Sequence, residues 1–118
     1  MFKRKYSFEQ RLFKSTQLHE KYPQHCPVIC ENIFHSKTSV KTKYLVSLDV
    51  TFSEFIYTVR KKLNLSKNTA LFFFINNSII PPLNSLFSTL YDSYKESDGF
   101  LYITYAGENT FGALKDTE

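Results

Sequence analysis

The sequence has no tryptophan, one methionine and only three glycines among its 118 residues. So little glycine argues against a loop-rich or repetitive fold, because such folds need many residues with an unrestricted backbone. Without tryptophan, the bulky part of a core has to come from 12 phenylalanines and 8 tyrosines. A chain of this length can bury one core, so we expect a single compact domain.

Cysteines and long apolar runs are also scarce. Cys26 and Cys30 flank a Pro-Val-Ile segment typical of extended chain, so we expect no disulfide between them and assume a reducing compartment. No apolar run is long enough to cross a bilayer, and the first ten residues lack the apolar core of a signal peptide. If the protein meets a membrane, we expect something else to attach it.

Basic residues outnumber acidic ones, by 15 to 11, which gives a net charge of +4 and a pI near 9.0. This excess favours acidic partners, whether acidic peptides, anionic lipid headgroups or phosphates, and does not choose among them. The cations gather at the N-terminus and in the middle of the chain: Lys3, Arg4, Lys5, Lys37, Lys41, Lys43, Arg60, Lys61 and Lys62.

Two capping boxes mark the starts of helices. Ser7 and Gln10 have the spacing at which each side chain satisfies a backbone N–H, so a helix should begin near Phe8 and end before Pro23. The same spacing recurs at residues 51–54. Behind it, apolar side chains at helical spacing predict the clearest helix of the chain: Phe52, Phe55, Ile56, Val59 and Leu63.

Four segments have the character of strands: residues 26–30, 43–47, 70–75 and 100–105. Pro27 favours a sheet edge or a strand start, because proline lacks a backbone N–H. The continuous apolar run of residues 70–75 favours a buried strand. We also expect brief pairing at residues 79–80, a short helix capped by Ser85, and a flexible tail from Ala106 onward. This order of elements is compatible with an α+β fold of the β-grasp type.

Several blocks, in this order, carry a resemblance to a known family. They are Lys21-Tyr22-Pro23, Pro27 through Glu31, Lys43-Tyr44-Leu45-Val46, Ala70 through Asn77, Pro81-Pro82, Gly99-Phe100-Leu101-Tyr102 and Gly107 through Gly112. From Phe8 to Gly112 the chain closely resembles the autophagy-related ubiquitin-like modifiers, the family of the GABA-receptor-associated protein and the microtubule-associated protein light chains. The resemblance implies a ubiquitin-like β-grasp over residues 23–106, an N-terminal helical extension over 1–22 and a flexible C-terminal tail over 107–118.

The resemblance also implies a processing and conjugation site. A cysteine protease would cut after Phe111-Gly112, at the bond to Ala113, and an E1-like enzyme, an E2-like enzyme and an E3-like complex would join Gly112 to phosphatidylethanolamine. Gly112 has no Cβ, so a narrow enzyme channel can close on its backbone. The attached lipid would supply the missing membrane anchor, at about 0.8 kcal/mol per buried methylene.

By the same resemblance, the protein is no enzyme and needs no cofactor. It would be cytoplasmic and, once lipidated, bound to autophagosomal and vacuolar or lysosomal membranes. Its partners would be cargo receptors and adaptors with acidic-aromatic-x-x-aliphatic motifs. No specific nucleic acid is expected.

Two pockets for such a motif are implied beside strand 43–47. The aromatic pocket would be lined by Leu18, Pro27, Lys43, Leu45 and Phe100. The aliphatic pocket would be lined by Tyr44, Val46, Val50 and Phe55. Acidic flanking residues would meet His25, Lys41 and Lys62, and Phe72 and Phe74 would help the processing protease recognise the fold. The alternative is that every apolar member of the two pockets is a core residue, and we expect this to be at least partly true of Val50 and Phe55.

Three residues depart from the family pattern and are expected to alter partner preference. Lys14 stands where the family usually has an acidic residue, Ser47 replaces a usual proline, and Thr58 replaces a usual aliphatic residue.

Two rival functions remain open at this stage. His19, His25, Cys26 and Cys30 could suggest a hydrolase or a metal site, but their spacing matches no zinc pattern. An unconjugated adaptor could bind microtubules or another acidic partner through residues 1–11, where Phe2, Tyr6 and Phe8 interleave with basic residues.

Overall fold

The computed structural model describes residues 1–33, 42–65 and 68–107. The elements of these parts are α1 (Phe2–Lys5), α2 (Phe8–Lys21), β1 (His25–Asn32), β2 (Lys43–Ser47), α3 (Phe52–Leu63), β3 (Leu71–Ile75), α4 (Phe87–Tyr94) and β4 (Leu101–Gly107). The strands form one sheet in the order β2-β1-β4-β3. None of the helices in the described residues is long and apolar enough to span a membrane.

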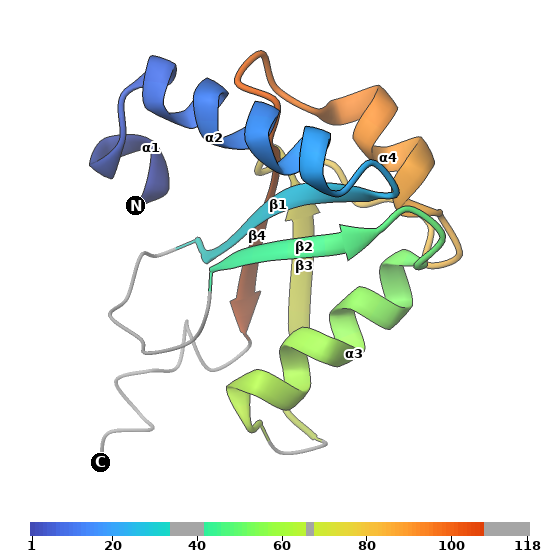
Figure 1. Ribbon diagram of the computed structural model, residues 1–118. Coiled ribbons are helices and arrows are strands. Elements are labelled where there is room, and N and C mark those ends of the chain that lie inside the picture. Colours follow the sequence, from blue (N-terminus) through green and yellow to red (C-terminus); the bar gives the residue numbers. More distant parts are fainter. Residues whose placement is uncertain (34–41, 66–67, 108–118) are drawn as a thin grey trace.

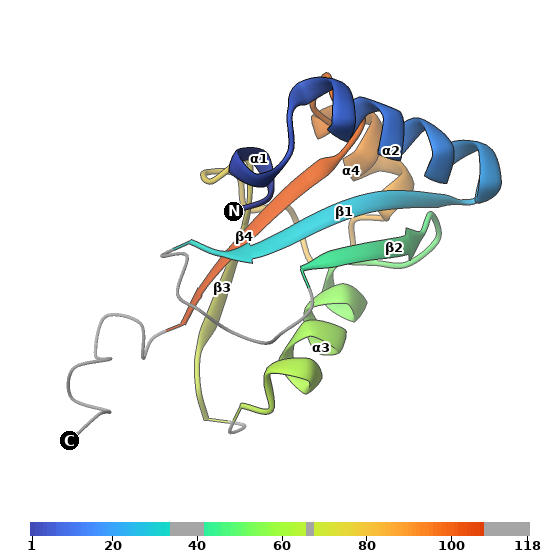
Figure 2. The ribbon, with the colours of Figure 1, turned by 60° about the vertical axis from the view of Figure 1, so that its left-hand side comes forward.

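The sheet is parallel at its centre and antiparallel on both sides. β1 and β4 run parallel, with Val28 opposite Leu101, while β2 pairs antiparallel with β1, and β3 with β4. In Figures 1 and 2, α3 lies on one side of the sheet, and α1 and α2 lie on the other. This topology confirms the predicted β-grasp arrangement.

Both predicted capping boxes are formed. The Ser7 hydroxyl accepts a hydrogen bond from Gln10 N at 3.1 Å, and Gln10 Oε1 accepts one from Ser7 N at 2.8 Å. Thr51 and Glu54 make the equivalent pair at the start of α3, and Asn64 ends that helix in the left-handed conformation. Local sequence therefore fixes where α2 and α3 begin.

Two apolar clusters hold the helices on the two sheet faces. The larger cluster joins α3 and α4 to one face, and its aromatic centre is Phe52, Phe55, Phe73, Phe87 and Tyr105. The smaller cluster on the other face consists of Phe2, Ile29, Phe100 and Tyr102, with Tyr6 and Leu18 packed against it. The second cluster attaches the N-terminal segment to the sheet.

Helix α1 was not predicted, because it has four residues and no side-chain cap. Tertiary contacts stabilise it instead. The Phe2 ring is buried, with its centroid 5.0 Å from that of Phe100, and Phe2 N donates a hydrogen bond to Glu31 Oε2 at 2.9 Å. The N-terminal segment is therefore folded onto the sheet.

Pro27 was predicted at a sheet edge or a strand start, but β1 is an inner strand that begins two residues earlier, at His25. Cys30 N donates to Thr42 O at 2.8 Å, and hydrogen-bonded pairs alternate along an antiparallel ladder. Pro27 therefore faces Leu45 in a pair that exchanges no hydrogen bonds. Pairing with β4 starts only at Val28, so the missing N–H interrupts neither ladder.

Strand β3 was predicted to be buried, and this is wrong because it forms the second edge of the sheet. Phe73 and Ile75 face the core, whereas Phe72 is 50% exposed. A continuous apolar run cannot tell an edge strand with one exposed aromatic face from a central strand.

The segment between β3 and β4 differs in detail from the prediction. The brief pairing predicted at residues 79–80 is present as a single bridge between Ile79 and Ile75, too short to make a strand. Helix α4 is preceded by Leu86, with no side-chain cap, so Ser85 does not cap it. Strand β4 extends to Gly107, so Ala106 and Gly107 belong to the sheet and not to the tail.

Candidate functional site

Strand β2 has one side free for pairing among the residues that the structure describes. Its inner side pairs with β1, and no described strand lies beyond it. Cys30 and Thr42 form a hydrogen-bonded pair, and such pairs alternate along the two strands. The N–H and C=O groups of Lys43 and Leu45 therefore point outward, away from β1. These groups can pair with an added extended peptide.

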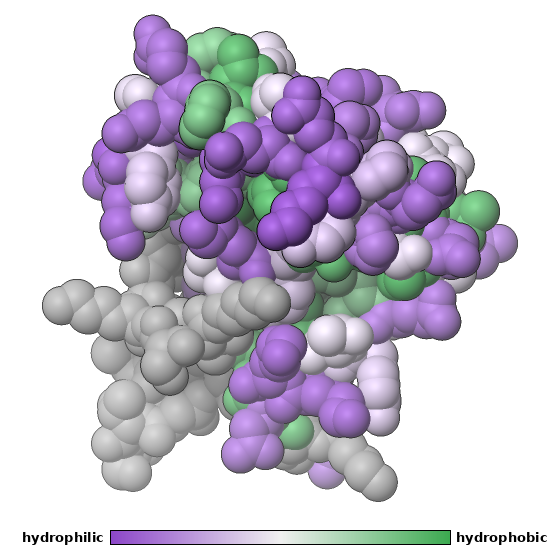
Figure 3. Space-filling model, in the orientation of Figure 1, coloured by the Kyte–Doolittle hydropathy of each residue, from purple (hydrophilic) through white to green (hydrophobic). Residues whose placement is uncertain are grey.

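The side chains of β2 alternate between the two faces of the sheet, as predicted. Tyr44 and Val46 are buried in the larger cluster, Lys43 is exposed and Leu45 is half-buried. In Figure 3, hydrophobic surface shows over the sheet, between more hydrophilic surfaces over α2 and α3. A peptide added to β2 would therefore have apolar surface beside it.

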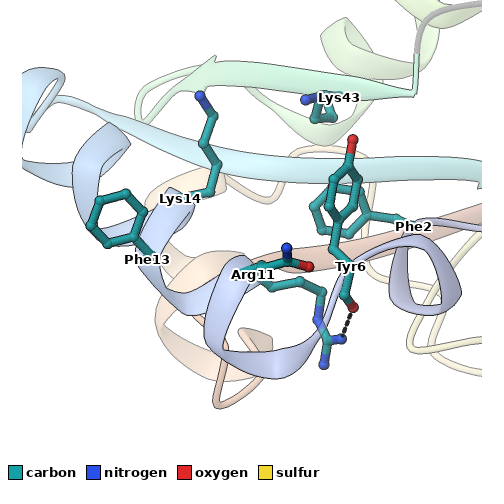
Figure 4. Close-up of a pocket in the computed structure, with 7 residues that line it drawn as sticks. Phe2, Tyr6, Arg11, Phe13, Lys14 and Lys43 are labelled. Carbon is teal, nitrogen blue, oxygen red and sulfur yellow. Dashed lines mark hydrogen bonds between the residues drawn. The ribbon is translucent and has the colours of Figure 1, made fainter.

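A cavity of about 330 Å³ lies on the Lys43 side of β2 (Figure 4). Its lining residues come from the N-terminal segment, from α2 and from β2: Phe2, Tyr6, Gln10, Arg11, Phe13, Lys14 and Lys43. The rings of Phe2 and Tyr6 pack with centroids 5.1 Å apart. Aromatic walls with cationic groups around them suit an aromatic side chain carried by an acidic peptide.

Of the five residues predicted for the aromatic pocket, only Lys43 lines this cavity. Pro27 and Phe100 are buried in the protein, and Leu18 packs against the smaller cluster. Leu45 is half-buried on β2. The sequence prediction missed Phe2 and Tyr6, although their spacing of four residues is that of one helix face.

The residues predicted for the aliphatic pocket belong largely to the core. The Tyr44 and Phe55 rings are both buried, with centroids 5.3 Å apart, and Val46 is buried beside them. Val50 is only partly buried. Burial raises the pKa of Tyr44 to about 12, so its hydroxyl stays protonated at neutral pH.

The residues predicted to meet acidic flanks are spread around this edge. His25 is half-buried at the start of β1, with its ring 6.0 Å from that of Tyr22. Lys62 is exposed in the last turn of α3. Lys41 lies outside the described residues.

A polar network fixes the position of α2 next to this cavity. Arg11 Nε donates to Asp98 Oδ2 at 2.8 Å, and Arg11 Nη1 donates to Tyr6 O at 2.8 Å, the bond drawn in Figure 4. Its hydrogen bond to Asp98 raises the pKa of the Arg11 guanidinium. The hydroxyl of Tyr102 also donates a hydrogen bond to Asp98. Burial is the larger cause of the raised pKa of Tyr102, and this hydrogen bond raises the pKa further. The charge of Arg11 is thus paired with a carboxylate of the protein itself.

The residues behind the rival hydrolase or metal site are not arranged for such chemistry. Cys26 and Cys30 are buried, and burial raises the pKa of both thiols, to about 12 for Cys26. Both are therefore neutral at physiological pH and poor nucleophiles. Within the described ranges, no three His, Cys, Asp or Glu side chains are grouped to hold a metal ion.

The other predicted site residues lie on β3 and in the tail. Phe72 and Phe74 lie on the same face of β3, and Phe72 is the more exposed of the two. Phe111, Gly112 and Ala113 lie outside the described residues. Of the three departures from the family pattern, Lys14 lines the cavity, while the hydroxyls of Ser47 and Thr58 bond locally to Asp49 and to the Glu54 carbonyl.

Comparison with known proteins identifies the family. Residues 10–112 match the family described as "Autophagy protein Atg8 ubiquitin like". Autophagy-related protein 8 of Schizosaccharomyces pombe is 49% identical, with 96% of this chain and 94% of that protein covered, and that of Pichia angusta is 44% identical, with 99% and 94% covered.

Solved structures agree with this match. The crystal structure of Trypanosoma brucei ATG8 has a TM-score of 0.78 at 32% identity, covering 91% of this chain and 93% of that one. Plasmodium falciparum Atg8, in complex with a P. falciparum Atg3 peptide, has a TM-score of 0.77 at 28% identity, covering 89% and 94%. The chain therefore belongs to the Atg8 family of ubiquitin-like autophagy proteins.

Proposed function

We propose that this protein is cut after Gly112 and joined through that residue to phosphatidylethanolamine, and that β2 binds acidic-aromatic-x-x-aliphatic peptides of receptors and adaptors. The observation that carries the peptide-binding part of the proposal is the outer side of β2, with its outward backbone groups at Lys43 and Leu45 next to an aromatic-walled cavity. This combination offers main-chain pairing for any extended segment and a specific place for one anchor.

A structural neighbour supports peptide binding. The P. falciparum Atg8 structure holds a peptide of Atg3, and it shares the fold of this chain. By analogy, the conjugation enzymes are among the partners that we propose for this protein, and cargo receptors would use the same strand. The net charge of +4 favours the acidic flank of the motif.

Two observations support conjugation at Gly112. The family match ends at residue 112, and the last strand ends at Gly107, five residues earlier. After hydrolysis of the bond to Ala113, an E1-like enzyme would adenylate the Gly112 carboxylate with ATP and release pyrophosphate. An enzyme cysteine thiol would then displace AMP to form a thioester, which passes by thiol exchange to the cysteine of the E2-like enzyme. Attack by the headgroup amine would then give the amide and release the thiol.

The exposed ring of Phe72, with Phe74 on the same face of β3, gives the processing protease an apolar surface to recognise. This surface lies on the sheet edge opposite β2. Protease recognition and peptide binding would therefore use separate edges.

Calorimetric titration of a peptide with the acidic-aromatic-x-x-aliphatic motif tests the peptide-binding half of the proposal. We expect binding with a Kd in the micromolar range and loss of binding when the aromatic residue is replaced by alanine. No binding of the intact motif at high micromolar concentration would contradict the proposal.

The alternative of an adaptor with a free basic arm finds less support. Phe2 is buried, Lys3 pairs with Glu96, and Arg11 pairs with Asp98. Phe2, Lys3 and Arg11 are thus engaged within the protein, whereas Arg4, Lys5 and Phe8 are exposed.

A further inference from the structure

We propose that the C-terminal tail of the uncleaved protein is a ligand for β2 of a second copy of the chain. The inference rests on the proposed peptide-binding function and names an occupant that processing would remove. Two observations carry it. Strand β2 has an outer side with no described strand beyond it, and residues 108–114 read Glu-Asn-Thr-Phe-Gly-Ala-Leu, an aromatic-x-x-aliphatic sequence that follows an acidic residue.

The tail places its two apolar residues at the spacing of the proposed motif. Phe111 and Leu114 are separated by two small residues, and Glu108 lies three positions before Phe111. In extended chain, side chains three positions apart point to opposite faces. A tail that pairs with β2 would therefore direct Phe111 to the cavity of Figure 4 and Leu114 to the opposite face of the sheet, on which α3 packs.

The register of the sheet fixes where the tail starts relative to β2. Strand β4 pairs Tyr105 with Asn32 of β1 and ends two residues later, at Gly107. Lys43 of β2 pairs with Ile29, three residues before Asn32. Gly107 therefore lies about 16 Å further along the sheet than Lys43, and three strand spacings, about 14 Å, from the outer side of β2.

This separation is too long for the tail to reach β2 of its own chain. The two distances combine to about 21 Å, which the backbone from Gly107 to Phe111 would have to cover. That length of fully extended chain spans at most about 14 Å. Pairing at Leu45 would require a still longer span. The tail of a second copy is free of this restriction, so the partner is another molecule of the uncleaved chain.

Such a contact would join copies head to tail. Each copy offers one tail and one β2 edge, and the two contact surfaces differ, so the interface is heterologous. Because the contact consists of one short peptide on one strand, we expect the same micromolar range of Kd as for the receptor peptides. Association would therefore rise with protein concentration.

Processing would end this contact, because the scissile bond lies between the two anchors. Hydrolysis between Gly112 and Ala113 leaves Phe111 on the protein and releases Leu114 with residues 113–118. The protease must also hold this bond in its own active site, so a tail paired with β2 would be protected from cleavage. Uncleaved chains would thus occupy one another's β2, and cleavage would free this strand for receptors.

Sedimentation velocity of the full-length, uncleaved protein at increasing concentration tests the inference. The wild type is compared with Leu114→Ala, which removes the aliphatic anchor, and with Thr117→Ala. The second variant is a matched control, because it shortens a side chain of the same tail outside the motif. Both positions lie beyond the scissile bond and outside the helices and strands of the described fold. Circular dichroism checks that all three proteins are folded.

We expect the average mass of the wild type and of Thr117→Ala to rise above the 13.9 kDa of one chain between about 10 and 500 µM. Leu114→Ala should weaken this association by about tenfold or more, because it truncates one of the two anchors. An excess of the acidic-aromatic-x-x-aliphatic peptide should return the wild type to the monomer, because both ligands need the same strand.

Calorimetry of the same peptide on Leu114→Ala separates the inference from the proposed function. If the peptide binds this variant while the uncleaved wild type stays monomeric over the whole range, the inference is overturned and peptide binding stands. Association that Leu114→Ala does not weaken, or that the peptide does not reverse, would also overturn the inference, because the contact would lie elsewhere. If the peptide binds none of the three proteins, the inference and the proposed function both fail.

Discussion

The guanidinium of Arg11 on α2 lies 2.8 Å from the carboxylate of Asp98, which is 2% exposed at the turn before β4. Asp98 also accepts hydrogen bonds from the Tyr102 hydroxyl and from Phe100 N, at 2.5 and 3.0 Å. One buried carboxylate thus joins the N-terminal helices to the sheet.

Replacing this carboxylate should detach the N-terminal segment. We expect Asp98→Ala to lower the free energy of unfolding by about 3 kcal/mol, because Arg11, Tyr102 and Phe100 N lose a buried partner. Urea denaturation measures this value, and Asp92→Ala, at an exposed aspartate of α4, is the control. A loss no larger than that of the control would show that the network does not stabilise the fold.

The outer backbone of β2 can be tested without disturbing its inner side. Leu45 N–H points away from β1, so Leu45→Pro should abolish peptide binding and leave the fold intact. Val46→Pro, one residue later, removes an inward N–H and should destabilise the protein strongly. Calorimetry and circular dichroism measure the two effects. A Leu45→Pro variant that is folded and still binds the motif peptide with wild-type affinity would argue against strand addition.

The buried cysteines should be inert in the folded state. Cys26 and Cys30 are at most 1% exposed, so a disulfide reagent should react with them at least about a hundred times more slowly than in denaturant. Thiol titration at pH 8 with and without urea measures the difference. Fast reaction of either thiol in the native protein would contradict its burial.

Burial of Cys26 also predicts an alkaline loss of stability. The folded pKa, about 12, lies above the unfolded one, so the folded state keeps a proton that the unfolded state releases. The free energy of unfolding contributed by this thiol is intact below about pH 8.5 and falls above it by about 1.4 kcal/mol per pH unit. In urea denaturation between pH 9 and 11, the free energy of unfolding of Cys26→Ala should fall less steeply with pH than that of the wild type. An unchanged slope would mean that this thiol does not contribute.

Gly99 should tolerate no side chain. Its φ is +87°, and a Cβ there would overlap Ser15 Oγ and lie 2.9 Å from Ser15 Cβ. We expect Gly99→Ala to destabilise the protein by about 2 kcal/mol or more. Measured against Ser15→Gly alone, Gly99→Ala should cost less than it does in the wild type but still destabilise, because the clash is relieved and the backbone strain remains. Thermal unfolding of the single and double variants measures both, and no remaining cost in the Ser15→Gly background would show that φ contributes nothing.

The sequence was informative where structure is local. Capping residues such as Ser7 and Thr51 and the apolar stripe of α3 were sufficient to place α2 and α3, because those signals act within one helical turn. Helix α1 depends on the docking of Phe2 against Phe100, residues almost a hundred positions apart. No local pattern encodes such a contact.

The candidate site was predictable only in part, for a related reason. The alternation of Lys43 and Tyr44 on β2 follows from strand geometry, whereas the walls of the cavity depend on how α1 and α2 pack. The resemblance directed attention to Pro27 and Phe100, which the structure buries. Tyr6 lines the cavity, but from the sequence it was considered only as part of the basic N-terminal segment in the adaptor hypothesis.

The most direct test of the account is mass spectrometry of the protein's C-terminus from its native cells. We expect a membrane-bound form that ends at Gly112 and carries phosphatidylethanolamine as an amide, and a Gly112→Ala variant that never forms it. A mature protein that keeps residues 113–118 and carries no lipid would contradict the account.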